Sequence, residues 1–563
     1  MVGTFGMCNL LQPVASLNIR MSGNHVVFIT GEYRLPLLLF STIFSLHHEV
    51  RGRRRGREGY RTYRNPRTTI AASVFPLVDL SVLRMKKDCN DGLCGGVSHS
   101  KRQRLRLRLR RSKNNRKQDG LSQRGLGCGT ATMTSDRCVS CTTFNILAPI
   151  YNRLDKEDQS RRESQYRSYW LSRNQSIIER LLGERSSIIC LQEVWLGNDE
   201  LVEMYEKRLG DAGYAIVKLA RTNNRGDGLL TAIRRDCFRI LEYQELLFND
   251  LGDRVAQLLH VESVVPFLQS KNCNIQQQML IVNTHLLFPH DYTLCIVRLH
   301  QVYKILRRID SYEIDHSLNP MPIMLCGDWN GSKRGHVYKF LRSQGFVSSY
   351  DVAHQYTDSE ADAHKWVSHR NHRGNICGVD FIWLWNPNTP RKPLRHSWNA
   401  AVLGMIKYLL LHQACFSEEN AFAFLKGDCA GEYITFPSFC QALCQLGLSG
   451  HPHGLTTKQM EDLWIRADTD GKGELNYREF EKKIWNPRWL EKAEEEEEED
   501  EESRCTQSSG VPSQAFGFNV KDAALFPPEV EKGMWPDNYT LSDHAHLTVL
   551  FSPVKIHCSQ SVC

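Results

Sequence analysis

The chain has 563 residues, a net charge of +8 and 19 cysteines. This length has room for two or three domains with a large buried core. No stretch reaches the roughly 18 to 20 apolar residues that a membrane helix requires. The cysteines lack paired spacing and several lie inside apolar runs, which favours reduced thiols of an intracellular protein over a disulfide framework.

The charge is unevenly distributed along the chain. Residues 1–135 hold 24 Lys and Arg against 7 Asp and Glu, so they carry +17 and the remainder carries −9. Blocks of like charge repel one another in a compact state, so we expect a disordered, basic N-terminal region. The alternatives are a nuclear-localisation or RNA-contacting arm and an organellar transit peptide. We expect the protein in the cytoplasm or the nucleus.

Polar side chains follow buried apolar runs at six places in the chain. The clearest run, 323–326, breaks at Gly327 and leads into Asp328 and Asn330. The other polar residues placed in this way are Asn145, Glu193, His285, Asp380 and the pair Asp543 and His544. Six placements of this chemistry are hard to explain as six ordinary turns, and they indicate a shared site.

The periodicity of residues 136–395 predicts groups of strands with helices between them. We expect strands over 139–147, 187–192, 214–218, 229–233, 254–261, 279–286, 323–326 and 379–384, and helices over 161–182, 201–212, 293–309 and 337–344. Because strands predominate without strict alternation, the fold class is α/β, a four-layer sandwich of two packed mixed sheets flanked by helices.

Residues 396–490 differ from the rest and predict an all-α EF-hand pair. Positions 1, 3, 5, 7, 9 and 12 of one loop are occupied by Asp468, Asp470, Lys472, Glu474, Asn476 and Glu479. This pattern matches the calcium loop, in which position 7 binds through its carbonyl and position 12 is a bidentate Glu. Lys472 places a positive charge where an oxygen donor is usual, so we expect weakened calcium affinity. The partner loop lacks the carboxylates, and its Ile434 should pair with Leu475.

An acidic linker follows the helical pair. Residues 491–514 contain nine consecutive acidic residues, 494–502, and a run of this kind is extended and solvated. An ordered pattern resumes over 515–556. We therefore expect the EF-hand pair to be inserted between two parts of one α/β domain, 136–395 and 515–556.

Seven short motifs resemble the endonuclease/exonuclease/phosphatase superfamily. In chain order they are FNILAP (144–149), LQE (191–193), RGDGLL (225–230), NTHL (283–286), GDWN (327–330), VDFIWL (379–384) and SDH (542–544). FNILAP and LQEVW resemble the deadenylase and nocturnin branch most, and the EF-hand pair resembles the plant calcium-binding members. The resemblance implies phosphoester hydrolysis that depends on Mg²⁺, with Glu193 as the principal ligand and Asn145 and Asp543 near it.

The same resemblance implies the catalytic roles. Asp328 matches the carboxylate that orients or deprotonates the attacking water, and Asn330 would hold a phosphate oxygen. His285 would lie on the phosphate or assist the leaving oxygen. His544 would stabilise the transition state, while Asp380 fixes its tautomer and raises its pKa.

Several readings of substrate and calcium remain open. The first is a 3′–5′ exoribonuclease, acting on poly(A) or other RNA 3′ ends. The others are a phosphoesterase acting on phospholipid, inositol phosphate or nucleotide 2′-phosphate, and a calcium sensor on an inert scaffold. Calcium would act on catalysis because the connections of the insert lead to Asp380 and to Asp543 and His544. The EF-hand pair could instead recruit a protein partner or stabilise the fold.

Overall fold

The computed structural model describes residues 138–155, 160–267, 277–288, 294–358, 365–428, 431–486 and 514–558. In the basic region 1–135 it describes only the backbone of β1 (Arg20–Ser22) and β2 (His25–Val27), which pair antiparallel. The rest of the expected tail and the acidic run 494–502 lie outside the described residues. The elements that carry the site all belong to the unit Leu126–Cys563.

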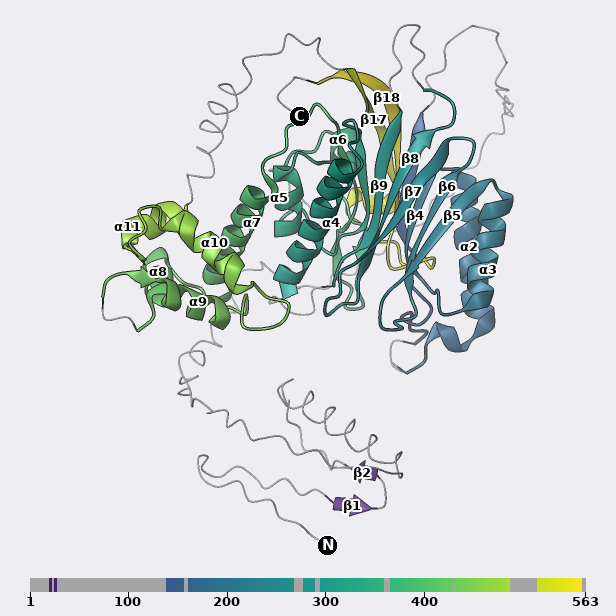
Figure 1. Cartoon of the computed structure of the whole chain (residues 1–563). Coiled ribbons are helices and arrows are strands. Elements are labelled where there is room, and N and C mark those ends of the chain that lie inside the picture. Colours follow the sequence, from purple (N-terminus) through teal and green to yellow (C-terminus); the bar gives the residue numbers. More distant parts are fainter. Residues whose placement is uncertain are drawn as a thin grey trace, which may run out of the picture. The chain divides into compact units, whose positions relative to one another are not determined.

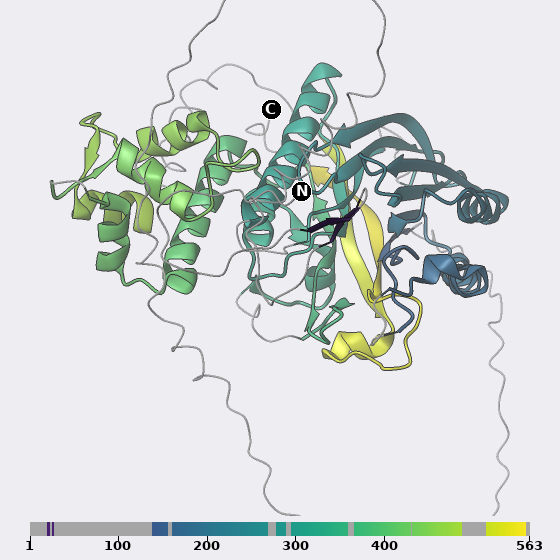
Figure 2. The same ribbon diagram turned by 90° about the horizontal axis from the view of Figure 1, so that it is seen from below.

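The first large sheet has the strand order β17-β18-β3-β4-β6-β5. Its members are β3 (Val139–Asn145), β4 (Ile188–Val194), β5 (Tyr214–Ala220), β6 (Gly228–Arg234), β17 (Gln514–Phe526) and β18 (His546–His557). β3 and β4 run parallel and the other neighbours run antiparallel. Helices α2 (Arg167–Glu184) and α3 (Asp199–Asp211) cover its outer face, where Phe144 and Leu191 pack with Trp170 (Figures 1 and 2).

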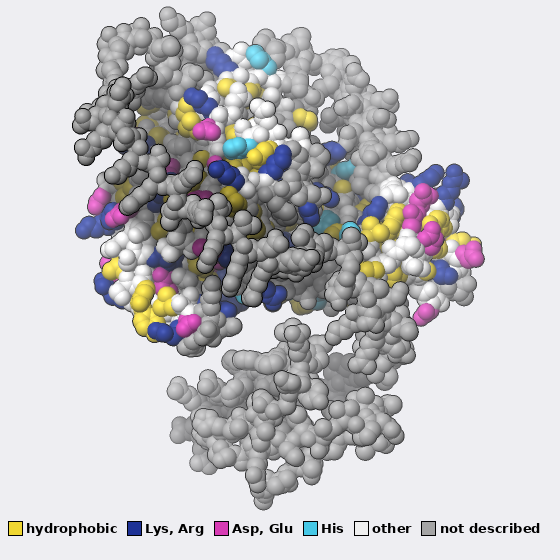
Figure 3. All heavy atoms as spheres, turned by 180° about the vertical axis from the view of Figure 1, so that it is seen from behind, with side chains coloured by type: hydrophobic (Ala, Val, Ile, Leu, Met, Phe, Trp, Pro, Cys, Tyr) yellow, Lys and Arg dark blue, Asp and Glu magenta, His cyan; other side chains and the backbone are white. Residues whose placement is uncertain are grey.

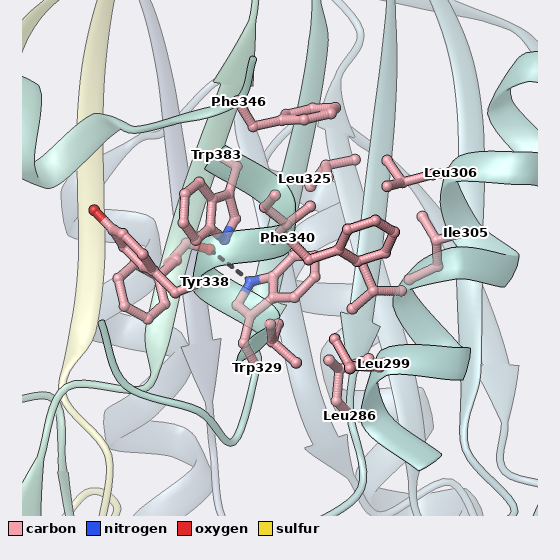
Figure 4. Close-up of a cluster of buried hydrophobic side chains, with 14 of the residues drawn as sticks. Leu286, Leu299, Ile305, Leu306, Leu325, Trp329, Tyr338, Phe340, Phe346 and Trp383 are labelled. Atoms are coloured by element: carbon pink, nitrogen blue, oxygen red, sulfur yellow. Dashed lines mark hydrogen bonds between the residues drawn. The ribbon is translucent and has the colours of Figure 1, made fainter. Parts of the chain in front are cut away.

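The second large sheet has the order β11-β14-β10-β9-β8-β7. Its members are β7 (Phe238–Leu247), β8 (Val255–Ser263), β9 (Gln278–His285), β10 (Ile323–Asp328), β11 (Val347–Ser348) and β14 (Asp380–Trp385). Helix α4 (Cys295–Asp315) connects β9 to β10, so these two strands run parallel. On this outer face Leu325 and Trp329 pack with Phe340 of α5 (His336–Ser343) and with Leu306 of α4 (Figure 4).

The inner faces of the two sheets pack against each other. Because side chains alternate along a strand, Cys141, Thr143 and Asn145 of β3 share the inner face. Cys141 contacts Cys326 of β10, with their sulfurs 3.5 Å apart, and both thiols are fully buried. The Gln192 amide of β4 also donates to the Oδ1 of Asn283 in β9 at 2.8 Å, across the interface between the two sheets. The molecule is therefore a mixed α/β fold with two sheets between helices, as the sequence predicts.

A group of helices lies in the chain between β14 and β17. It comprises α7 (Leu394–Tyr408), which continues as a wider helical turn over Leu409–Gln413, then α8 (Glu418–Lys426), α9 (Phe436–Gln445), α10 (Thr457–Ala467) and α11 (Tyr477–Phe480). The short strands β15 (Ile434–Thr435) and β16 (Glu474–Leu475) pair Ile434 with Leu475, as predicted. In the view of Figure 3, acidic and basic side chains are interspersed on the described surface.

Smaller described elements include α6 (Ser349–Ala353), β12 (His369–Arg370) and β13 (Ile376–Cys377). Among the described residues no single helix has the length and apolar character of a membrane span. Helical segments 394–413 and 418–426 reach that length and apolar character only when taken together, with a bend of 111° between them.

Candidate functional site

The ends of five strands, three in the second sheet and two in the first, bring the expected polar residues together. In the second sheet Asp328 lies in register with His285 on one side and with Asp380 on the other. In the first sheet Asn145 lies in register with Gln192, and Glu193 follows at a bulge in β4. The Asn145 amide spans the two sheets, with its Nδ2 3.1 Å from Asp328 Oδ2 and 3.3 Å from Glu193 Oε1. One site therefore lies where the two sheets meet.

Unusual backbone conformations occur at this site. Gly327, just before Asp328, has φ 146°, and a Cβ there would lie 1.9 Å from the carbonyl oxygen of Thr284. Only glycine fits this position. Glu193 and Asn330 have φ values of 55° and 48°, in the left-handed region that non-glycine residues seldom adopt. Such conformations persist where the surrounding structure fixes them, and they cluster at functional sites.

Carboxylate and amide oxygens form the candidate cation site. Glu193 Oε2 accepts a hydrogen bond from the backbone N–H of Ala148 at 3.2 Å, and Oε1 faces Asn145. Burial, together with the negative charges of Asp227 and Asp543, raises the pKa of Glu193 to about 7. Crowded carboxylates of this kind are stabilised by a nearby cation, and hard dications prefer oxygen ligands. The donor set of Asn145, Glu193 and Asp543 thus fits a divalent ion such as Mg²⁺.

Asp328 lies at the centre of the site. Its Oδ1 accepts a hydrogen bond from the backbone N–H of Asn330 at 2.9 Å. Its Oδ2 faces the Asn145 amide, lies 3.2 Å from His285 Nε2 and lies 3.7 Å from His544 Nε2. This oxygen is thus shared by side chains from both sheets and from the loop before β18.

His544 forms a buried ion pair with Asp380. Its Nδ1 lies 2.9 Å from Asp380 Oδ2, which also accepts a hydrogen bond from the Ser368 hydroxyl at 2.6 Å. Burial alone would lower the pKa of His544, but the charges of Asp380 and Asp328 outweigh it and raise that pKa to about 10. The ring of His369 stacks on His544 with centroids 4.2 Å apart. His544 is therefore an imidazolium whose Nε2–H faces the site.

His285 has the opposite electrostatic surroundings. Burial and the positive charges of Arg254 and Arg221 hold the pKa of His285 well below its usual value. The buried Arg254 lies with a guanidinium nitrogen 2.9 Å from Nδ1, and because arginine can only donate, Nδ1 accepts. The proton of the neutral ring is then on Nε2, beside Asp328. The Asn330 amide lies 3.0 Å from Nε2 and donates to the Leu286 carbonyl at 2.9 Å.

The structure thus groups the eight residues predicted for the catalytic site. Asp543 is the most exposed of them, with its carboxylate 3.8 Å from the ring of His369. Sequence reasoning missed Arg254 and Ser368, which orient His285 and Asp380. Arg254 was assigned only as the first residue of a strand, and nothing in its local pattern distinguishes it.

The predicted calcium loop is exposed and lies outside this site. Asp468 accepts hydrogen bonds from the backbone N–H groups of Lys472 and Gly473, at 3.0 and 2.7 Å. The Lys472 ammonium pairs with the carboxylate of Asp470. Asn476 and Glu479 cap each other at the start of α11, with bonds of 2.9 and 3.0 Å between side chain and backbone. Glu474, the last of the predicted ligand positions, lies in β16.

Known proteins resemble this chain at several levels. No protein-family model matches it. A calcium-binding protein of Arabidopsis thaliana is 58% identical over 439 residues, which cover 78% of this chain and 89% of that protein. Carbon catabolite repressor protein 4 homologs 1 and 3 of the same plant are 28% and 30% identical. The matches cover 37% and 36% of this chain and 36% and 42% of the two homologs.

Solved structures give weaker matches. The human nocturnin catalytic domain has 20% identity and a TM-score of 0.32, over 44% of this chain and 82% of that one. ANGEL2, a 2′,3′-cyclic phosphatase, has 18% identity and a TM-score of 0.34, over 44% and 84%.

The chain belongs to the endonuclease/exonuclease/phosphatase superfamily, to which its carbon catabolite repressor 4 and angel relatives also belong. Within this superfamily, the chain is similar to the calcium-binding protein of Arabidopsis over most of the length of both proteins.

Proposed function

We propose that this protein is a Mg²⁺-dependent phosphodiesterase that shortens RNA from its 3′ end, and that its preferred substrate is oligo(A). The observation that carries the proposal is the Asn145 amide, which lies within 3.3 Å of both Glu193 and Asp328. A candidate cation ligand and a candidate base are thereby held side by side at one site.

The metal would be held by Glu193, Asn145 and Asp543. When bound, Mg²⁺ neutralises phosphate charge and polarises the phosphoryl oxygens. The raised pKa of Glu193 supports this assignment, because the carboxylate lies among other negative charges that a dication would compensate.

The side chains divide the remaining chemistry between them. Asp328 is the group that takes the proton of the attacking water, since its Oδ2 lies at the centre of the site. The His544 imidazolium, held by Asp380, donates its Nε2–H to the phosphoryl oxygen that gains charge in the transition state. The Asn330 amide and the Nε2–H of the neutral His285 lie 3.0 Å apart, and as two donors they would both bind a phosphate or leaving-group oxygen placed beside them. Arg254 keeps the His285 proton on the nitrogen that faces the site.

We also propose that calcium bound at 468–479 modulates this activity. Helix α10 ends at Ala467, directly before Asp468, the first residue of the loop, and it carries Gln459 near its start. The Gln459 amide lies 3.0 Å from Nε2 of His300 on α4. Two residues earlier on α4, Arg298 donates to the backbone carbonyl of Asn330. A shift of α10 on calcium binding would therefore displace α4 through His300, and α4 would in turn displace the turn at Asn330 through Arg298.

A substrate panel tests the proposed function. The full-length protein with Mg²⁺ is incubated with oligo(A), with RNA of other 3′ sequence, with sphingomyelin liposomes, with inositol phosphates and with a nucleotide 2′-phosphate. We expect hydrolysis of the RNA from its 3′ end, and a rate that differs between added Ca²⁺ and a calcium chelator. If the protein hydrolyses the liposomes or the small phosphoesters and leaves the RNA intact, RNA is not the substrate. The protein would then still be a phosphoesterase.

A further inference from the structure

Arg173 of helix α2 uses all of its donor groups close to the candidate metal site. Its Nε and one terminal nitrogen donate to the two carboxylate oxygens of Glu163 at 2.9 and 2.6 Å. The terminal nitrogens also donate to the backbone carbonyls of Ile146, Leu147 and Leu541 at 2.7, 2.7 and 2.8 Å. The side chains of this ion pair are only 9% and 3% exposed.

The three carbonyls belong to two loops far apart in the sequence. Ile146 and Leu147 directly follow Asn145, and Leu541 precedes Ser542 and Asp543. The two loops are also joined by the Ser542 hydroxyl, which donates to the Asn145 carbonyl at 2.7 Å. Arg173 thus holds the chain immediately beside two of the three proposed Mg²⁺ ligands.

The planar guanidinium suits this task better than any other side chain. Its five N–H groups have a fixed geometry, so they bind a carboxylate bidentately and reach carbonyls on the other side at the same time. A lysine ammonium keeps the charge but has only three donors on one atom. Because a buried ion pair contributes little net stability, conformational specificity is the better reason for placing one here.

We propose that Arg173, oriented by Glu163, is a positioning residue that sets the separation of Asn145 and Asp543 for binding Mg²⁺. The inference rests on the proposed function, because it assumes that Glu193, Asn145 and Asp543 hold the ion. Arg173 touches neither the ion nor the substrate. It acts on the two loops that carry the ligands.

The test is a calorimetric Mg²⁺ titration of the full chain. All proteins carry Glu479→Gln, so that the calcium loop contributes little, and Glu193→Gln identifies the heat that belongs to this site. We expect Arg173→Lys to weaken Mg²⁺ binding about ten-fold or more, which is the usual effect of losing a group that orients a ligand. Amide hydrogen exchange should rise at 146–148 and 541–545.

Arg180→Lys is the matched control. Arg180 lies on the same helix and stacks over Phe526 at 3.8 Å, and it donates to Glu184 where Arg173 donates to the loop carbonyls. It should change neither Mg²⁺ affinity nor exchange in the loops. Unchanged Mg²⁺ affinity in a folded Arg173→Lys protein would overturn the inference.

A second variant covers the case in which Arg173→Lys does not fold. Glu163→Gln leaves the guanidinium in place and loosens its orientation, so we expect weaker Mg²⁺ binding with a smaller change in thermal stability. Wild-type affinity in Glu163→Gln would again overturn the inference. If Glu193→Gln binds Mg²⁺ as well as the wild type does, the proposed metal site itself fails, whatever Arg173 does.

Discussion

His544 and Asp380 form a buried ion pair, with 2.9 Å between Nδ1 and Oδ2, although 163 residues separate them in the sequence. The two residues are 5% and 0% exposed. All the described helices from α7 to α11 lie in the sequence between the two partners. The site can therefore form only when β14 and the segment before β18 come together, on either side of the helical insert.

Removing the charge of Asp380 should shift the pH dependence of hydrolysis. In the wild type the raised pKa of about 10 keeps His544 protonated at pH 8, so the rate should not fall with rising pH until near that value. In Asp380→Asn the burial remains and the larger favourable charge is lost, while Asp328 stays, so the pKa of His544 should fall from about 10 and less of the ring should be protonated at pH 8. We expect a loss of about ten-fold or more at pH 8 and a smaller loss near pH 5.5. A kcat/KM profile parallel to that of the wild type would contradict the role of the pair.

Gly327→Ala should destabilise the fold and abolish activity. The new Cβ would lie 1.9 Å from the Thr284 oxygen in the neighbouring strand, at a φ of 146°. We expect the free energy of unfolding to fall by about 3 kcal/mol or more, as measured by chemical denaturation. Gly210→Ala in α3 is the control, because nothing lies within 4 Å of its Cβ and alanine favours a helix. Equal stability of the two variants would show that the close approach of the strands is relaxed in solution.

His300 should make the protein less stable in acid. Burial lowers the pKa of His300 to about 4, whereas in the unfolded chain it is about 6.5, so between these values the unfolded state binds more protons. Stability should therefore fall as pH drops from about 6.5 to about 4, by at most about 3 kcal/mol.

His300→Gln tests this dependence. The substitution should flatten that part of the curve of unfolding free energy against pH, and His372→Gln, at an exposed position, should not. The contact of His300 with Gln459 and its tilted ring contact with Trp398, with centroids 4.7 Å apart, would then be the titrating part of the interface with the insert. An unchanged slope in His300→Gln would assign the acid sensitivity to other groups.

Replacing Lys472 should strengthen calcium binding. The ammonium pairs with Asp470 and occupies the position at which most loops of this kind have an oxygen donor. Lys472→Asn removes the positive charge and supplies that oxygen, so we expect affinity to rise about ten-fold. Competition with a chromophoric chelator measures it, with Lys482→Asn outside the loop as the control. Equal affinities would mean that position 5 does not contact the ion.

The sequence predicted those parts of the fold in which local pattern and burial agree. β3, β4, β9 and β10 are buried along nearly their whole length and were found within two residues. β7 was missed because exposed and half-buried residues alternate along it, with Glu242 and Glu245 among them. The last strand, β18, begins at His546, and before it His544 forms an isolated antiparallel bridge with His369 that no local pattern shows.

The residues of the candidate site also fall into those that the sequence predicted and those that it did not. Residues such as Asp328 could be predicted because each follows an apolar run at the end of a strand. Arg254, Ser368 and Arg173 could not, because each acts through a partner that the local sequence does not show. Arg173 illustrates the reason, since one of its three carbonyl partners lies 368 residues away.

The most direct test of the account is Mg²⁺-dependent cleavage of RNA labelled at its 5′ end and ending in oligo(A), by the full-length wild type and by Glu193→Gln. We expect a ladder of products shortened from the 3′ end for the wild type. The rate should saturate with Mg²⁺ and fall at least about a hundred-fold in the variant. Equal cleavage by the two proteins, or cleavage that persists in a metal chelator, would contradict a metal-dependent site at Glu193.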